Sequence, residues 1–193
     1  MDKWTNMIKT ILAFHKAVDS YTVKHQRNVA RISGLIAKEL GLDREHIRKI
    51  KLCALVHDVG KIAIPIFLLN KTSPLMKEEF ELIKTHTKNN ALIKAKIFTY
   101  APFYEVITQH HERLNGSGYP LGLKSDDICF EAKLIAVADV YEAMSTDRPY
   151  RRALGEKATI EHIISGVGTL YDQNVVKAFE KVYQEWRQGQ VFA

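Results

Sequence analysis

Apolar residues recur three and four positions apart along almost the whole chain, and alternation of apolar with polar residues is nowhere sustained. The first spacing is typical of amphipathic α-helices, whereas alternation is typical of half-buried β-strands. The sequence therefore predicts an all-α fold, a single compact bundle of about seven or eight helices. Its 193 residues suit one domain. We expect residues 1–19 to form an N-terminal helix packed on a domain over residues 20–193, the alternative being that this helix pairs two copies in a homodimer.

Caps and stop signals place several of these helices. Gly41 is expected to end a helix over 23–40, and Asp43 to cap a helix whose inward stripe reaches His57, with Lys61 one turn further on. The Pro-, Gly- and Asn-rich segments 62–72 and 115–127 are expected to be loops long enough to line a site. One further helix is expected to start at Ser73-Pro74, with Leu82 and His86 on one face, and another near Pro102. The last three helices are expected over 130–144, 156–166 and 173–186.

The balance of charge favours anionic partners. The chain has 28 Lys plus Arg against 22 Asp plus Glu, a net charge of +6, and a pI near 9.2. Phosphates and nucleotides fit this balance. Because no lysine-rich block or basic tail concentrates the charge, binding of a nucleic-acid polymer is not indicated.

Membrane and secretory classes are disfavoured by the apolar pattern. No stretch reaches the roughly 18 to 20 uninterrupted apolar residues of a membrane span, and charges interrupt the first twenty residues, unlike a signal peptide. Two cysteines, Cys53 and Cys129, are too few for a disulfide scaffold, and we expect each to be a small buried hydrophobe. We therefore expect a cytoplasmic protein.

Histidines on inward stripes are the main chemical signal. A single inward histidine is usually a hydrogen-bonded core residue, but several imidazoles and carboxylates buried together would each lose solvation. A metal centre resolves that conflict, because neutral imidazoles and ionised carboxylates suit iron, manganese, cobalt, nickel or zinc. The predicted cluster comprises His25, His57, Asp58, His86, His110, His111 and Asp139.

Two adjacent pairs, His57-Asp58 and His110-His111, suggest two metal ions. Consecutive helical residues point about 100° apart, so one pair can reach two ions, or one ion and its bridging water, from a single turn. Ions about 3.5 to 4 Å apart can activate a bridging hydroxide and hold a phosphoryl oxygen, which suits phosphodiester hydrolysis. Lys61 is expected to neutralise charge on the phosphate, the alternative being a surface lysine at a helix end.

The motifs HDVGK at 57–61 and HHERLNGSGYP at 110–120 resemble the HD-GYP family of metal-dependent phosphodiesterases, a branch of the HD-domain phosphohydrolases. The HD dipeptide alone is weak evidence, whereas the GYP string with its ordered histidines is specific. The resemblance continues in order through YTVKHQRNVA at 21–30, KTH at 84–86, AKLIAVADVYEAM at 132–144, DRPYR at 147–151 and YDQNVV at 171–176. It implies an HD-domain helical bundle.

The resemblance implies hydrolysis of cyclic di-GMP, or a related cyclic dinucleotide, to pGpG or GMP. All seven residues of the cluster match metal-ligand positions, with Asp58 as the carboxylate that bridges two ions. Tyr21 stands where family members with three metals have glutamate, and a neutral phenol is a poor ligand. We therefore expect two divalent ions, with iron or manganese first among first-row metals.

Other matches imply contacts with substrate. Lys61 matches a lysine that contacts the scissile phosphate, and Arg148 and Arg151 match basic positions that hold phosphates or guanine, their alternative being a solvated turn. Gly118, Tyr119 and Pro120 match a loop that shapes the active site and has been linked to protein partners. Glu112 and Arg113 are expected to be structural, with Arg113 bracing this loop through a carboxylate.

Two departures keep an alternative open. Asn90 stands where the family commonly has glycine, so its side chain is expected either to narrow the site or to face solvent, and Asn115 replaces an acidic residue. The alternative is a weakly active or inactive module that binds a cyclic dinucleotide or a protein. A mononucleotide phosphohydrolase and a metal-free helical protein with core histidines are the two further readings.

Overall fold

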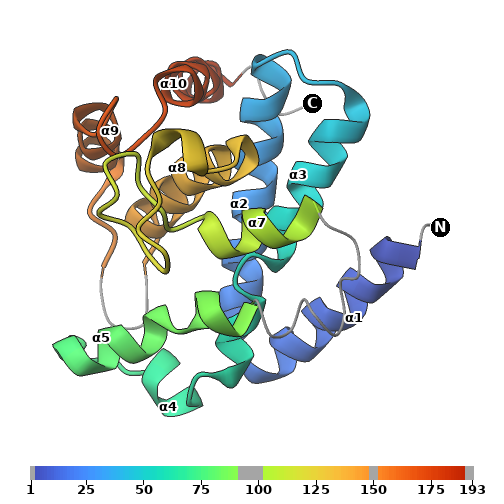
Figure 1. The fold of residues 1–193 in the computed structure, drawn as a ribbon, viewed down its shortest axis with the longest axis vertical. Coiled ribbons are helices and arrows are strands. Elements are labelled where there is room, and N and C mark those ends of the chain that lie inside the picture. The colour runs from blue at the N-terminus through green and yellow to red at the C-terminus, as the bar shows by residue number, and fades with distance from the viewer. Residues whose placement is uncertain (1–2, 91–101, 148–151, 190–193) are drawn as a thin grey trace.

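The computed structural model describes residues 3–90, 102–147 and 152–189 (Figure 1). These ranges contain helices, loops and two isolated β-bridges but no strand, which confirms the predicted all-α fold. No helix in them is both long and apolar enough to cross a membrane. The elements are α1 (Lys3–Val18), α2 (Ser20–Glu39), α3 (Arg44–Val56), η1 (Val59–Ala63), α4 (Ile66–Leu69), α5 (Lys77–Lys84), α7 (Pro102–Gln109), η2 (Ser125–Asp127), α8 (Phe130–Ser145), α9 (Glu156–Ser165) and α10 (Gln173–Arg187).

Aspartate caps and one glycine fix the ends of three helices. Asp19, Asp43 and Asp172 accept hydrogen bonds from backbone N–H groups in the first turns of α2, α3 and α10. Gly41, with φ +75°, follows the end of α2 in the left-handed conformation. The predictions for Asp43 and Gly41 are therefore confirmed. The start of α2 lies at Ser20, earlier than predicted, because Asp19 supplies the cap.

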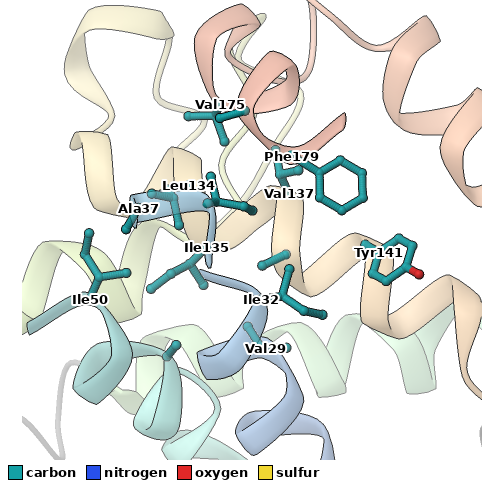
Figure 2. Packing of buried hydrophobic residues seen from close by; sticks show 14 of the residues in the cluster. Val29, Ile32, Ala37, Ile50, Leu134, Ile135, Val137, Tyr141, Val175 and Phe179 are labelled. Atoms are coloured by element: carbon teal, nitrogen blue, oxygen red, sulfur yellow. The ribbon is translucent and has the colours of Figure 1, made fainter. Parts of the chain in front are cut away.

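Helix α2 lies at the centre of the bundle and packs against α3, α8 and α10 (Figure 1). Figure 2 shows Ile32 of α2 and Ile50 of α3 in one cluster with Ile135 of α8 and Phe179 of α10. Each of these side chains is buried, and burial of one such group contributes about 1.5–3 kcal/mol. The core thus holds α2 and α8, which carry two of the predicted metal ligands, in fixed relative positions.

A second, smaller apolar cluster joins α1 to the rest of the chain. Helix α1 packs against α2, α3 and η1, and His15 of α1 hydrogen-bonds through Nε2 to the carbonyl oxygen of Val59 at 3.2 Å. Both His15 and Val59 are buried. The cluster comprises Ile8, Leu12, Val23, Val56, Val59 and Ile107, so α1 covers the segments that flank the predicted ligands.

Helix ends near the site differ from the prediction. The periodic pattern continues past His57, but α3 ends at Val56 and Lys61 lies on the 3₁₀ helix η1. Helix α5 starts after Met76 rather than at Ser73-Pro74, because the Glu79 carboxylate accepts a hydrogen bond from the Met76 N–H (2.7 Å).

The predicted loop over 62–72 contains α4, and the predicted long helix to His86 is interrupted. Helix α5 ends at Lys84, and a separate helical segment covers 86–90. His86 is buried whereas Leu82 is 44% exposed. The prediction that these two residues share one inward face is therefore wrong, because α5 ends at Lys84 and His86 belongs to the next helical segment.

Candidate metal centre

The structure brings the seven residues of the predicted cluster together from five segments. His25 lies on α2, Asp139 on α8 and His86 at the start of the 86–90 segment. The two adjacent pairs lie where helices end, His57-Asp58 after α3 and His110-His111 after α7. The prediction that each pair occupies one helical turn is therefore wrong. The two side chains of each pair stay close together: His57 Nε2 lies 3.4 Å from Asp58 Oδ2, and the ring centroids of His110 and His111 are 4.0 Å apart.

The ligand atoms form two groups that share Asp58. One group is Asp58, His86, His110 and His111, the other is His25, His57 and Asp58, and within each group the ligand atoms lie within 4.8 Å of one another. Each oxygen of Asp58 faces one group. Its Oδ2 lies 3.4 Å from His57 Nε2 and its Oδ1 lies 3.3 Å from His86 Nε2. A carboxylate so placed can bridge two cations.

Asp139 is a second carboxylate between the groups. Its Oδ1 lies 3.0 Å from His25 Nε2 and 3.8 Å from His57 Nε2, whereas its Oδ2 lies 3.7 Å from His111 Nδ1. The side chains of Asp139, His25 and His57 are buried. Two buried carboxylates therefore face five imidazoles.

Backbone carbonyls set the tautomers of three histidines. The carbonyl three residues earlier accepts a hydrogen bond from Nδ1 of His57 (2.7 Å), His86 (2.8 Å) and His110 (3.0 Å). Because a carbonyl only accepts, Nδ1 carries the proton and the Nε2 lone pair faces the cluster. These three Nε2 atoms and Asp58 Oδ1 are buried without a hydrogen-bond partner. Such orphaned acceptors are costly alone and fit metal coordination.

Glu142 orients His25 in a different way. A carboxylate oxygen of Glu142 hydrogen-bonds to His25 Nδ1, and the other accepts a bond from Asn28 Nδ2 at 3.0 Å. Glu142 is buried. We did not predict this residue from the sequence, although its position three residues after Asp139 on α8 places it one turn from a predicted ligand.

Burial and charge leave three of the imidazoles and the shared carboxylate in the forms that bind metals. Burial lowers the pKa of His86 to about 4 and holds the pKa values of His110 and His111 well below their usual range. Burial opposes ionisation of Asp58, but the neighbouring groups, with the charge of Lys61 first among them, outweigh it and hold the pKa of Asp58 well below the usual range. Neutral imidazoles and ionised carboxylates are the ligand forms for a divalent ion.

A cleft of about 240 Å³ opens onto the cluster. Lys61 lines it, with Nζ 2.6 Å from Asp58 Oδ2 and a side chain that is 15% exposed, unlike a surface lysine. Tyr21, Arg113 and Tyr119 also line the cleft. Its apolar lining comprises Leu69, Leu75, Phe80, Ile83, Val140 and Ala143.

The carboxylate that braces the loop after His111 belongs to Glu112. Buried Glu112 accepts hydrogen bonds from the backbone N–H groups of Leu121 (2.7 Å) and Leu123 (3.0 Å). Arg113, which was expected to brace the loop through a carboxylate, instead donates to the carbonyl oxygens of His110 (3.3 Å) and Glu112 (2.8 Å). The loop is thus anchored directly beside the histidine pair.

The GYP residues lie against His111. Tyr119 N donates to the His111 carbonyl oxygen at 3.2 Å, and the ring centroids of these residues are 4.6 Å apart. Gly118 is required by contact rather than by a positive φ, because a Cβ there would lie 2.5 Å from the His111 carbonyl oxygen. Pro120 follows through a cis peptide bond.

Arg148 and Arg151 lie outside the described residues.

Comparisons with known proteins show the family of the chain. The family model for the HD domain matches residues 6–175. A cyclic di-GMP phosphodiesterase from Thermotoga maritima is 38% identical over 171 residues, which cover 86% of this chain and 46% of that protein. The 3′3′-cGAMP-specific phosphodiesterase 1 of Vibrio cholerae is 37% identical over 138 residues, which cover 72% of this chain and 32% of that protein.

A solved structure has the same fold. Bd1817, an HDG"Y"P protein from Bdellovibrio bacteriovorus, superposes with a TM-score of 0.72 at 21% identity, covering 92% of this chain and 60% of that chain. The resemblance to HD-GYP proteins predicted from the motifs is confirmed. The chain spans less than half the length of the two curated phosphodiesterases.

Proposed function

The chain belongs to the HD domain family, and we propose that it is a phosphodiesterase that hydrolyses a cyclic dinucleotide at a centre of two divalent metal ions. The observation that carries this proposal is the pair of buried ligand groups that share Asp58. The similar phosphodiesterases from Thermotoga maritima and Vibrio cholerae support the substrate class.

The two ions would be held by the two groups. His25, His57 and Asp139 with one oxygen of Asp58 would hold one ion, and His86, His110 and His111 with the other oxygen would hold the second. This mixed nitrogen and oxygen set suits first-row divalent ions, and we propose iron or manganese. When bound, two such ions polarise a phosphoryl oxygen and lower the pKa of a coordinated water.

The chain's own residues position the substrate. Lys61 lies beside Asp58 in the cleft, where its ammonium group would hold the scissile phosphate and offset charge that develops on its oxygens. The apolar side of the cleft, including Phe80 and Ile83, would accommodate a nucleobase. Tyr119, anchored on His111, would complete the rim.

Cyclic di-GMP is the proposed substrate, with pGpG or GMP as product. The net charge of +6 favours such a dianionic ligand, and the proposal assigns Arg148 and Arg151 to its phosphates or guanine. The loop of Gly118, Tyr119 and Pro120 is also proposed as a contact for protein partners, since the adjacent Leu121 is 68% exposed.

The test is metal analysis after anaerobic purification, followed by chromatographic assay of cyclic di-GMP and 3′3′-cGAMP hydrolysis. We expect about two ions per chain and loss of hydrolysis in Asp58→Asn, which keeps the shape of the side chain. Asp172→Asn is the control, because asparagine caps a helix as well as aspartate and α10 lies outside the cluster. Two bound ions with retained but unhydrolysed dinucleotide would favour the binding module instead.

A further inference from the structure

Asn90 is fully buried and satisfies three backbone groups at once. Its Oδ1 accepts a hydrogen bond from Gly60 N at 2.5 Å, and its Nδ2 donates to the carbonyl oxygens of His57 at 2.6 Å and Ile107 at 2.7 Å. The expectation that this side chain narrows the cleft or faces solvent is wrong. It lies behind the cluster, and its amide uses both its donor and its acceptor capacity.

These three bonds join the segments that carry the proposed ligands. His57 is itself a proposed ligand, and Gly60 lies two residues after Asp58 on η1. Asn90 belongs to the helical segment that begins with His86. One side chain therefore connects the 57–61 turn, the 86–90 segment and the end of α7.

The hydrogen bond from Asn90 to the Ile107 carbonyl oxygen also affects which nitrogen of His110 carries the proton. The Ile107 carbonyl oxygen accepts from both Asn90 Nδ2 (2.7 Å) and His110 Nδ1 (3.0 Å), using the two lone pairs of one carbonyl. Asn90 thus holds the acceptor that keeps the proton of His110 on Nδ1 and its Nε2 toward the cluster.

The 57–61 turn lies directly against the 86–90 segment. A Cβ at Gly60 would lie 2.0 Å from the His86 carbonyl oxygen and 2.7 Å from Asn90 Oδ1. Asn89 Nδ2 also approaches the Gly60 carbonyl oxygen at 3.5 Å. The 57–61 turn and the 86–90 segment are therefore in direct backbone contact at Gly60.

We propose that Asn90 is a positioning residue for the metal centre, one that fixes the spacing between the His57-Asp58 pair, His86 and His110. The proposal rests on the proposed function insofar as those residues bind metal. Loss of the amide would remove the acceptor for Gly60 N–H and the donor to the His57 carbonyl oxygen, and it would leave the Ile107 carbonyl oxygen with His110 Nδ1 but without Asn90. The ligand segments would then no longer share one anchor.

The test compares Asn90→Ala with Ile163→Ala, a control that removes buried side-chain volume from α9. Both proteins are stripped of metal and titrated with Co²⁺, followed by visible absorption, and kcat and KM for cyclic di-GMP are then measured. We expect Asn90→Ala to weaken Co²⁺ binding and lower kcat by about 10- to 100-fold each. KM is expected to change by less than about threefold, because a residue behind the ligands does not touch substrate.

Ile163→Ala is expected to lower the Tm yet keep the Co²⁺ affinity, so lost stability alone cannot mimic the result. Unchanged Co²⁺ affinity in Asn90→Ala would overturn the proposal. If Asn90→Ala does not fold, amide exchange of Gly60 in the unaltered metal-free protein replaces it: strong protection is expected, and rapid exchange would overturn the proposal. Neither readout needs hydrolysis, so an unaltered protein that binds Co²⁺ without turnover refutes only the proposed function.

Discussion

Gly60 is the position where one added methyl group tests the architecture of the metal centre. A Cβ there would lie 2.0 Å from the His86 carbonyl oxygen and 2.8 Å from the backbone nitrogen of Asn90. Both are backbone atoms, so no side-chain rotation relieves the contact. The two segments must separate by at least 1.0 Å to lengthen the first distance from 2.0 Å to 3.0 Å, below which Cβ contacts essentially do not occur.

The separation determines how much stability and activity Gly60→Ala is expected to lose. Overpacking of a buried site costs about 1–3 kcal/mol, and contact with backbone on both sides places Gly60→Ala near 3 kcal/mol. For a chain of this size about 2–4 °C of Tm correspond to each kcal/mol, so the Tm is expected to fall by about 6–12 °C. A displacement of about 1 Å at a catalytic site typically lowers the rate about 100-fold.

Gly34→Ala is the matched control. A Cβ at Gly34 would lie 2.9 Å from Lys51 Cδ, which belongs to a flexible side chain that can move. Because Gly34 lies within α2, alanine is expected to stabilise the helix by about 0.5–1 kcal/mol. Urea unfolding of the metal-free proteins and metal analysis of the loaded ones measure both effects. The reasoning would be refuted if Gly60→Ala had the same free energy of unfolding as the unaltered protein and bound the same amount of metal.

Three further predictions concern the same centre. Glu142→Gln should weaken metal binding about 10- to 100-fold while the Tm of the metal-free protein changes little, measured by Co²⁺ titration and contradicted by unchanged affinity. Chelation should lower the Tm, and added Mn²⁺ should restore it in a concentration-dependent way, as calorimetry would show. Between about pH 6.5 and 4 the unfolded histidines bind protons while buried His86, His110 and His111, whose pKa values are lowered, stay neutral. The raised pKa of His25 acts with the opposite sign, but three lowered pKa values outweigh one raised value. The metal-free protein should therefore have a lower urea midpoint of unfolding at pH 5 than at pH 7. Equal midpoints at the two pH values would contradict this prediction.

Sequence reasoning located helices well where their own residues decide the structure. The caps Asp43 and Gly41 act within their own helix ends, and the apolar stripe of α10 repeats regularly, so periodicity and local signals suffice there. The seven clustered residues could also be predicted from local patterns. Ionisable residues on the inward faces of helices lose solvation, and a shared metal ion would compensate for that loss. The resemblance to HD-GYP proteins then matched all seven residues to metal-ligand positions.

Contacts between distant segments were beyond such reasoning. The apolar period runs on past His57, but α3 stops there, and the turn that follows packs Gly60 against His86, 26 residues away in the chain. Asn90 likewise bonds to residues 30 and 33 positions earlier and 17 later. Glu142 differs, since its position one turn after Asp139 was a local signal that could have been used.

The hydrogen bond from His15 to the Val59 carbonyl oxygen suggests a way to inhibit the proposed metal centre from outside the cleft. Val59 directly follows Asp58, and the apolar contacts of Ile8 and Leu12 hold α1 in place behind it. A ligand that wedges α1 away from η1 is expected to displace the shared carboxylate without entering the cleft. For the proposed hydrolysis of a cyclic dinucleotide, such an inhibitor would lower the maximal rate, and an excess of dinucleotide would not restore it.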